Sequence, residues 1–126
     1  MAVVGTVVNV IDKSGALKVK CIRILNGKYF WRVGSRAMVV VKNSRPARKR
    51  KRSVQAGEIH MALMVQCVGS QSRPTGYSIS FPDTNVILVK KSDLTPLSNR
   101  IVGTISQSLR FVPGARRILS MAYDAF

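Results

Sequence analysis

Runs rich in Val and Ile are separated by short turn signals from residue 3 to about residue 90, and this pattern predicts a small all-β barrel or sandwich. A first strand is expected over residues 3–11. A tight turn at Asp12-Lys13-Ser14-Gly15 should follow, because an Asp side chain can bond back to the backbone there. Apolar and basic residues then alternate, but the alternation slips by one residue at Cys21-Ile22. The slip indicates a β-bulge or a barrel corner.

Turn signals and alternation predict further strands in the middle of the chain. Asn26-Gly27 is typical of a type I′ hairpin turn, which needs positive φ at both central residues. A strand over residues 28–33 should follow, and Gly34-Ser35 should lead into another over residues 37–41. Regular alternation over residues 59–68 predicts a core strand. One face of the 28–33 strand would carry Tyr29, Trp31 and Val33, and the other Lys28, Phe30 and Arg32.

The last part of the chain combines strands with helical periodicity. Residues 69–76 are expected to form a loop that carries Arg73-Pro74, and residues 77–81 and 86–89 a final pair of strands. After residue 90 the apolar spacing becomes helical, and residues 115–122 predict a short helix. An earlier helical face would carry Ile105, Leu109 and Val112, and Pro113-Gly114 would end it.

These elements make one expected domain over residues 1–126, with the barrel in residues 3–90 and a C-terminal loop with short helices in residues 91–126. At 46% hydrophobic residues, the chain can bury a core without disulfides or a structural metal. We therefore expect a mainly β protein in which Cys21 and Cys67, which have no Cys-x-x-Cys spacing, are small buried side chains.

Charge changes this picture most between residues 43 and 56. The chain has 21 Lys and Arg against five Asp and Glu, a net charge of +16, and six of the bases lie within residues 45–52. We expect this segment to project as a basic hairpin or loop between two strands. A charged run is often merely solvated, but adjacent bases repel one another unless a polyanion neutralises them. Nucleic acid is therefore the leading partner.

The sequence favours a binding protein over an enzyme. The acids are scattered and mostly lie in or beside predicted turns, and His60 is the single imidazole, so no catalytic pair or metal-ligand cluster is evident. No phosphate-binding glycine loop is present either. We expect no cofactor, no metal and no small-molecule substrate. The five acids are Asp12, Glu58, Asp83, Asp93 and Asp124.

Aromatic and basic residues interleave around residue 30. Core aromatics beside a solvated basic face are favoured over base stacking by Phe30, which is the alternative. Residues 59–68 form the longest uncharged apolar stretch and are too short for a membrane span, so no membrane association is expected. The N-terminus lacks the features of a secretory or transit signal, and any targeting signal would be internal.

Several motifs resemble the universal large-subunit ribosomal protein L-fourteen family, nearly throughout the chain. The opening motif is Val8-Asn9-Val10-Ile11-Asp12-Lys13-Ser14-Gly15-Ala16-Leu17-Lys18-Val19-Lys20-Cys21-Ile22-Arg23-Ile24-Leu25. Further matches are Gly34 with Val39-Val40-Val41-Lys42, Ala62-Leu63-Met64-Val65 with Gly76, Phe81 and Thr84, Arg100-Ile101-Val102-Gly103, Leu109-Arg110 and Ile118-Leu119-Ser120-Met121-Ala122. Departures at Lys13, Ser35, Met64 and Thr75 indicate a diverged lineage. The bacterial and organellar branch fits best, with a mitochondrial member as first choice and a bacterial or plastid one as the alternative.

The resemblance implies a five-stranded β-barrel with a projecting hairpin and small C-terminal helices, bound to large-subunit ribosomal RNA. It also implies contact with small-subunit RNA at an intersubunit bridge, with a neighbouring protein of the L-nineteen family, and with a ribosome-silencing factor. Carried over by position, that last surface comprises Arg100, Arg117 and Ser120. Candidate RNA-binding residues are Lys13, Lys18, Lys20, Arg23, Lys28, Arg32, Lys42, Arg45, Arg48, Lys49, Arg50, Lys51, Arg52, Arg73 and Arg110.

The expected function is therefore structural: Lys and Arg side chains bind phosphates of folded RNA in the large ribosomal subunit, and no reaction is catalysed. One alternative is a free-standing barrel that binds single-stranded RNA or DNA, which would need exposed aromatic residues in a groove. A nucleic-acid-processing enzyme is the second alternative, and the absence of an acid cluster argues against it.

Overall fold

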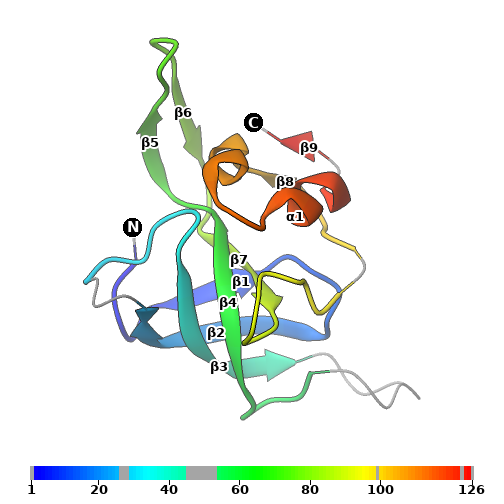
Figure 1. The fold of residues 1–126 in the computed structure, drawn as a ribbon. Helices are drawn as coiled ribbons and strands as arrows, with labels where there is room; N and C mark the ends of the chain where they lie inside the picture. The colour runs from blue at the N-terminus through cyan, green and yellow to red at the C-terminus, as the bar shows by residue number, and fades with distance from the viewer. Residues whose placement is uncertain (1, 26–28, 45–53, 99, 123, 126) are drawn as a thin grey trace.

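The computed structural model describes residues 2–25, 29–44, 54–98, 100–122 and 124–125 (Figure 1). Five strands close into a barrel in the order β1-β2-β3-β4-β7. β1 runs parallel to β7, and the other neighbouring pairs are antiparallel. The expected mainly β fold with a five-stranded barrel and short C-terminal helices is confirmed. The barrel strands are β1 (Val7–Val10), β2 (Ala16–Ile24), β3 (Arg36–Ser44), β4 (Ile59–Gln66) and β7 (Asn85–Val89).

The first hairpin follows the sequence pattern in all but its start. β1 begins at Val7 rather than at residue 3, because the chain turns at Gly5, whose φ is 93°. The predicted turn after β1 is confirmed: Gly15 has a φ of 109°, and the Asp12 side chain accepts a hydrogen bond from the Ser14 backbone at 3.2 Å. The register of β2 against β3 shifts after Cys21, which confirms the predicted irregularity.

The strand expected over residues 28–33 is wrong for the part that the structure describes. Trp31 makes only an isolated bridge with Ala2, and Ser35 closes a turn by bonding to the backbone of Arg32. The indole of Trp31 is buried and donates to the Ser35 carbonyl oxygen at 2.8 Å. Tyr29 is 85% exposed, so it does not share a face with Trp31. The Asn26-Gly27 turn lies outside the described residues.

A hairpin that the sequence concealed projects from the barrel (Figure 1). It consists of β5 (Gly69–Ser72) and β6 (Ser78–Phe81), which pair along their length. The loop expected over residues 69–76 is therefore wrong for residues 69–72 and holds for residues 73–76, and the two predicted strands over 77–81 and 86–89 are present but do not pair with each other. Both edges of β7 are already occupied by β1 and β4, so β6 pairs with β5 instead.

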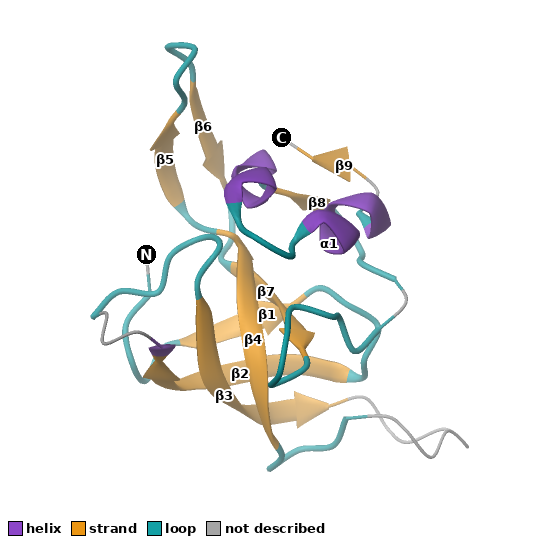
Figure 2. Ribbon diagram, viewed as in Figure 1, coloured by secondary structure: helices purple, strands orange, loops and turns teal. Residues whose placement is uncertain are grey.

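The C-terminal segment confirms the short helix predicted near residues 115–122. The earlier helical face expected for Ile105, Leu109 and Val112 is wrong in part, because Ile105 lies in a two-residue strand and only Leu109 lies within a helix. A 3₁₀ helix, η2 (Gln107–Phe111), buries Leu109, and α1 (Arg116–Met121) buries Ile118. Both lie at the end of the barrel from which the hairpin projects (Figure 2). A short parallel pair, β8 (Thr104–Ile105) with β9 (Asp124–Ala125), completes this part and was not predicted.

Two apolar cores result, because alternate residues of β4 and β7 face opposite sides. Ala62 and Met64 of β4 join the barrel interior, whereas Met61, Leu63 and Val65 pack against the C-terminal segment. A strand covered on both faces needs apolar residues at nearly every position, which explains the continuous run in β4. Cys21 and Cys67 are small buried side chains, as predicted.

Candidate nucleic-acid interface

The outer face of β2 carries a row of bases. Successive side chains of a strand point to opposite faces, so Val19 and Cys21 fill the barrel while Lys18 and Lys20 face solvent, as the alternation predicts. The register shifts after Cys21, and beyond the shift Arg23 is exposed while Ile24 is buried. Because β2 lies between β1 and β3, these Lys and Arg side chains lie in the middle of this part of the sheet and not at a sheet edge.

Neutral residues flank this row on both neighbouring strands. Lys18 lies across from Asn9 of β1 and Asn43 of β3, and Lys20 lies across from Val7 and Val40. Lys42 is also exposed, near the end of β3. We call the exposed side chains of Lys18, Lys20, Arg23 and Lys42 the basic wall.

Acidic partners for these bases are missing. Apart from Arg73, the described Lys and Arg side chains have no nitrogen within 4.0 Å of a carboxylate oxygen. Glu58 lies 2.8 Å from His60 Nε2, a hydrogen bond that lowers the pKa of the carboxyl group. Asp12 is buried and is used internally. The basic wall therefore presents charge that no ion pair among the described residues neutralises.

Other predicted RNA-binding residues are dispersed over the surface. Lys13, Arg32 and Arg110 are exposed, in the Asp12 turn, in the loop before β3 and in η2 respectively. Arg73 differs, because it is partly buried and one terminal nitrogen donates to Ser106 Oγ at 3.1 Å, which links the hairpin to the C-terminal segment. Lys28, Arg45, Arg48, Lys49, Arg50, Lys51 and Arg52 lie outside the described residues.

The three predicted docking residues are all exposed. Arg117 and Ser120 lie three residues apart on α1, and Ser120 Oγ donates to the Arg117 carbonyl oxygen at 2.7 Å. The carbonyl oxygen of Arg100 accepts a hydrogen bond from the Lys13 backbone at 3.2 Å. The structure thus brings Arg100, a predicted protein contact, beside Lys13, a predicted RNA contact.

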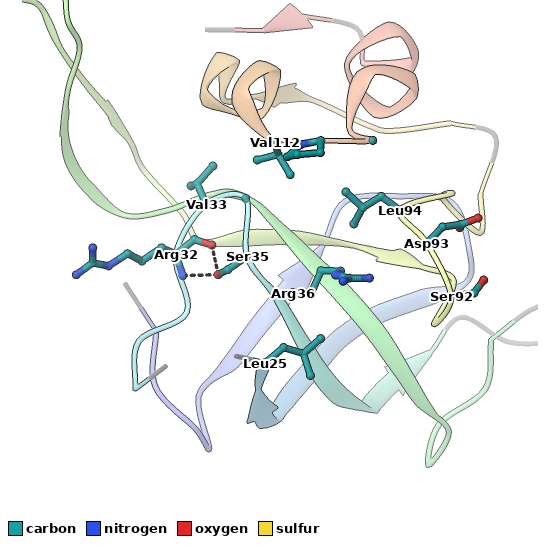
Figure 3. Close-up of a pocket in the computed structure, with 12 residues that line it drawn as sticks. Leu25, Arg32, Val33, Ser35, Arg36, Ser92, Asp93, Leu94 and Val112 are labelled. Carbon is teal, nitrogen blue, oxygen red and sulfur yellow. Dashed lines mark hydrogen bonds between the residues drawn. The ribbon is translucent and has the colours of Figure 1, made fainter. Parts of the chain in front are cut away.

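A groove of about 730 Å³ lies between the loop before β3 and the C-terminal segment (Figure 3). Leu25, Val33, Leu94 and Val112 give it an apolar lining, and Arg36 and Asp93 add charge. Hydrogen bonds from Thr95 hold the pKa of Asp93 below its usual value, with smaller contributions from Lys90 and Arg117. No local sequence pattern predicts this groove, because its walls come from segments that are far apart in the chain.

The part of the chain that the structure describes contains neither a cluster of metal-ligand side chains nor a membrane-spanning helix. No three His, Cys, Asp or Glu side chains of those residues gather in a way that could hold a metal ion. None of the helices formed by those residues combines the length and the apolar character that crossing a bilayer requires.

Comparisons with known proteins agree with the resemblance seen in the motifs. The family profile described as ribosomal protein L14p/L23e matches residues 1–126. One relative is the large ribosomal subunit protein uL14m of Schizosaccharomyces pombe, which is 34% identical over 106 residues. The aligned part covers 82% of this chain and 83% of that protein.

Proposed function

The chain belongs to the ribosomal protein L14p/L23e family, whose members are non-enzymatic structural constituents of the large ribosomal subunit, and from this premise we propose that its basic wall binds large-subunit ribosomal RNA. The observation that carries the proposal is the row of exposed bases on β2 with no carboxylate nearby. Phosphates of folded RNA are the ligands that such a row fits.

The barrel holds these Lys and Arg side chains at a fixed spacing. Lys18 and Lys20 are two residues apart on one strand, so their Cα atoms are separated by about 6.5 Å. A closed barrel holds this spacing without ordering a loop on binding, and each phosphate contact releases condensed counterions from the RNA. The protein therefore acts as a rigid positive surface that fixes a local RNA fold.

The basic arm supplies a second set of contacts in this proposal. Residues 45–52 contain no apolar residues other than Pro46 and Ala47, so they have little with which to pack against the barrel. We assign the bases of the arm, together with Lys13, Lys28, Arg32, Arg73 and Arg110, to RNA contacts outside the basic wall.

The surface formed by Arg100, Arg117 and Ser120 is assigned to the subunit interface. The family resemblance and the exposure of all three side chains support docking of a ribosome-silencing factor there. Contacts with small-subunit RNA and with a protein of the L-nineteen family complete the assignment. The similarity to a mitochondrial ribosomal protein supports a mitochondrial ribosome as the location.

The basic wall predicts a specific salt dependence. Replacing Lys18, Lys20 and Arg23 with Ser removes about three phosphate contacts, so the slope of log affinity against log salt should become shallower by about 2–3 units. The affinity of the purified protein for large-subunit ribosomal RNA, measured between low and physiological salt, gives this slope. A matched variant, with Ser at Lys90, Lys91 and Arg116, loses the same charge from exposed positions elsewhere. Equal slopes for the two variants would contradict the assignment to the wall.

The docking surface predicts selective loss of one partner. The double replacement Arg100→Glu and Arg117→Glu should abolish capture of a ribosome-silencing factor from the same source, because both cations are reversed, while entry into large subunits persists. Capture is measured by pull-down, and entry by sedimentation. The control variant carries Lys91→Glu and Arg116→Glu and should retain capture. Capture by the Arg100 and Arg117 variant would show that the factor binds elsewhere.

A further inference from the structure

Two consecutive aromatic side chains stand out from the surface of this highly charged protein. Tyr29 is 85% exposed and Phe30 is 45% exposed, whereas Trp31 next to them is fully buried. Single exposed apolar residues are ordinary in soluble proteins. Two adjacent aromatic rings beside a buried one are a different case, because the chain must hold them outward.

The anchor that holds them is Trp31. Its backbone N–H donates to the Ala2 carbonyl oxygen at 2.6 Å, and its carbonyl oxygen accepts from the Ala2 N–H at 3.0 Å. Its indole N–H donates to the Ser35 carbonyl oxygen at 2.8 Å. Trp31 is thus fixed by three hydrogen bonds and by burial, so the exposed side of this loop has little freedom to collapse onto the barrel.

The surroundings of the two rings are apolar and basic. Val3, which follows Ala2 after the isolated bridge between Ala2 and Trp31, is 47% exposed. Arg32 is exposed and extends away from the groove (Figure 3). The only carboxylate within residues 2–44 is Asp12, which is 5% exposed.

The segment after Val3 leads to the strand that carries the basic wall, because the Gly5 N–H donates to the Cys21 carbonyl oxygen at 2.8 Å and the Cys21 N–H donates to the Thr6 carbonyl oxygen at 3.0 Å. Val7 is exposed and lies across from Lys20, and Ile22 is exposed next to Arg23 at the irregularity of β2. A partner that covers the aromatic rings would therefore also meet a row of cations. A polyanion with apolar faces satisfies both requirements, and an unpaired stretch of RNA has that chemistry, with phosphates for the cations and base faces for the rings.

We propose that Tyr29 and Phe30 form a stacking platform for an unpaired base of large-subunit ribosomal RNA, with Arg32 at a neighbouring phosphate. The proposal rests on the RNA-binding function assigned to the basic wall and adds a base contact to it. Every base has a π-face, so a platform of this kind accepts an unpaired nucleotide of any sequence. It serves as a fixed point where a single-stranded segment meets the wall.

Stacking and phosphate contacts respond differently to salt, and this difference provides the test. Tyr29→Ser with Phe30→Ser should lower the affinity for purified large-subunit ribosomal RNA by about 5- to 150-fold for each base lost, with an unchanged slope against salt. The matched control is Tyr77→Ser with Phe111→Ser, because those side chains are 75% and 76% exposed at other places. The control should bind within about twofold of wild type. Tyr29→Phe with Phe30→Tyr should bind like wild type, since both positions keep a ring that can stack.

The folded state of each variant can be checked at the anchor itself. Trp31 is the single Trp of the chain and is buried, so its fluorescence emission reports whether the loop keeps its position. Affinities are compared only among variants with the emission of wild type. Wild-type affinity for the Ser variant would overturn the proposal. So would normal RNA binding combined with failure to enter large subunits, because the platform would then be a protein contact.

A measurement on native large subunits does not depend on binding in isolation. After ultraviolet irradiation and trypsin digestion, cleavage after Lys28 and Arg32 releases the peptide Tyr29-Phe30-Trp31-Arg32. We expect a nucleotide adduct on Tyr29 or Phe30, and the joined nucleotide identifies the base. If adducts form on peptides of β2 but not on this peptide, the stacking platform is wrong, whereas RNA binding by the basic wall is still supported. The absence of adducts from both would overturn the proposed function as well.

Discussion

Replacing Asp12 with Ala is expected to lower the free energy of unfolding by about 2–4 kcal/mol. Its carboxylate is buried and accepts from the Leu88 backbone at 3.0 Å and from the Ser14 backbone and hydroxyl at 3.2 and 2.6 Å. The substitution leaves the Leu88 N–H without an acceptor inside the protein. Because Leu88 is a fully buried residue of β7, water cannot replace the lost bond. Chemical denaturation of the isolated protein measures the loss.

Asp93 provides the control for this substitution. Its side chain accepts from the Thr95 backbone at 2.9 Å in a similar local turn, but it is fully exposed. Asp93→Ala should therefore leave the melting temperature nearly unchanged. A comparable loss of stability for the two variants would mean that Asp12 matters only through its local turn and not through its link to β7.

The stability difference between wild type and Asp12→Ala should also depend on pH. Burial raises the pKa of Asp12 above the ordinary value of 3.8, against the opposing effect of its hydrogen bonds. The folded state therefore binds the proton more tightly than the unfolded state does. The stabilisation of the folded state that comes from this tighter proton binding is fully present below the ordinary pKa. It is lost as pH rises through the raised pKa of the folded state. The difference should accordingly be larger in acid and shrink as pH increases through that window.

Replacing Gly34 with Ala should destabilise the protein by about 2–4 kcal/mol, for two separate reasons. Its φ of 87° is a conformation that side chains with a Cβ rarely adopt. An added Cβ would also lie 2.7 Å from Cγ2 of Val112. The loop before β3 cannot move away easily, because the Gly34 N–H donates to the Met64 carbonyl oxygen at 3.0 Å.

Gly57→Ala separates the two causes. Gly57 has nearly the same φ, 90°, but no atom lies within 4 Å of the position of its added Cβ. Its replacement should cost only the backbone strain, about 1–3 kcal/mol. The excess loss at Gly34 then measures the contact with Val112. Equal losses for the two variants, determined by thermal unfolding, would contradict a tight approach of the C-terminal segment to this loop.

The sequence predicted the strands whose apolar residues alternate, and it failed where contacts between distant segments decide the structure. β2 and β4 follow their patterns because one or both faces are covered by the cores. β5 has the sequence Gly-Ser-Gln-Ser, which has no apolar alternation because the hairpin projects from the barrel. The aromatic strand expected at residues 28–33 failed because Trp31 pairs with Ala2 from the start of the chain.

In the candidate site, too, periodicity predicted which side chains are exposed but not which distant segments lie together. The outward position of Lys18 and Lys20 follows from the period of a strand, that of Arg23 depends on the shift in register after Cys21, and the exposure of Arg117 and Ser120 follows from the period of a helix. Neither period could reveal that Lys13 lies beside Arg100 or that Gly34 lies against Val112. Those proximities arise from tertiary contacts that no local pattern records.

The parallel pairing of β1 with β7 constrains how the protein is made. Asn9 lies across from Asn85, so the barrel cannot close during synthesis until the ribosome has released most of the chain. Until then one edge of β1 has no neighbour, while β2 and β3, with their bases, have already emerged. A nascent chain in this state exposes both an open strand edge and a polyanion-binding surface to the translating ribosome. Closure of the barrel around β1 therefore has to await the synthesis of β7.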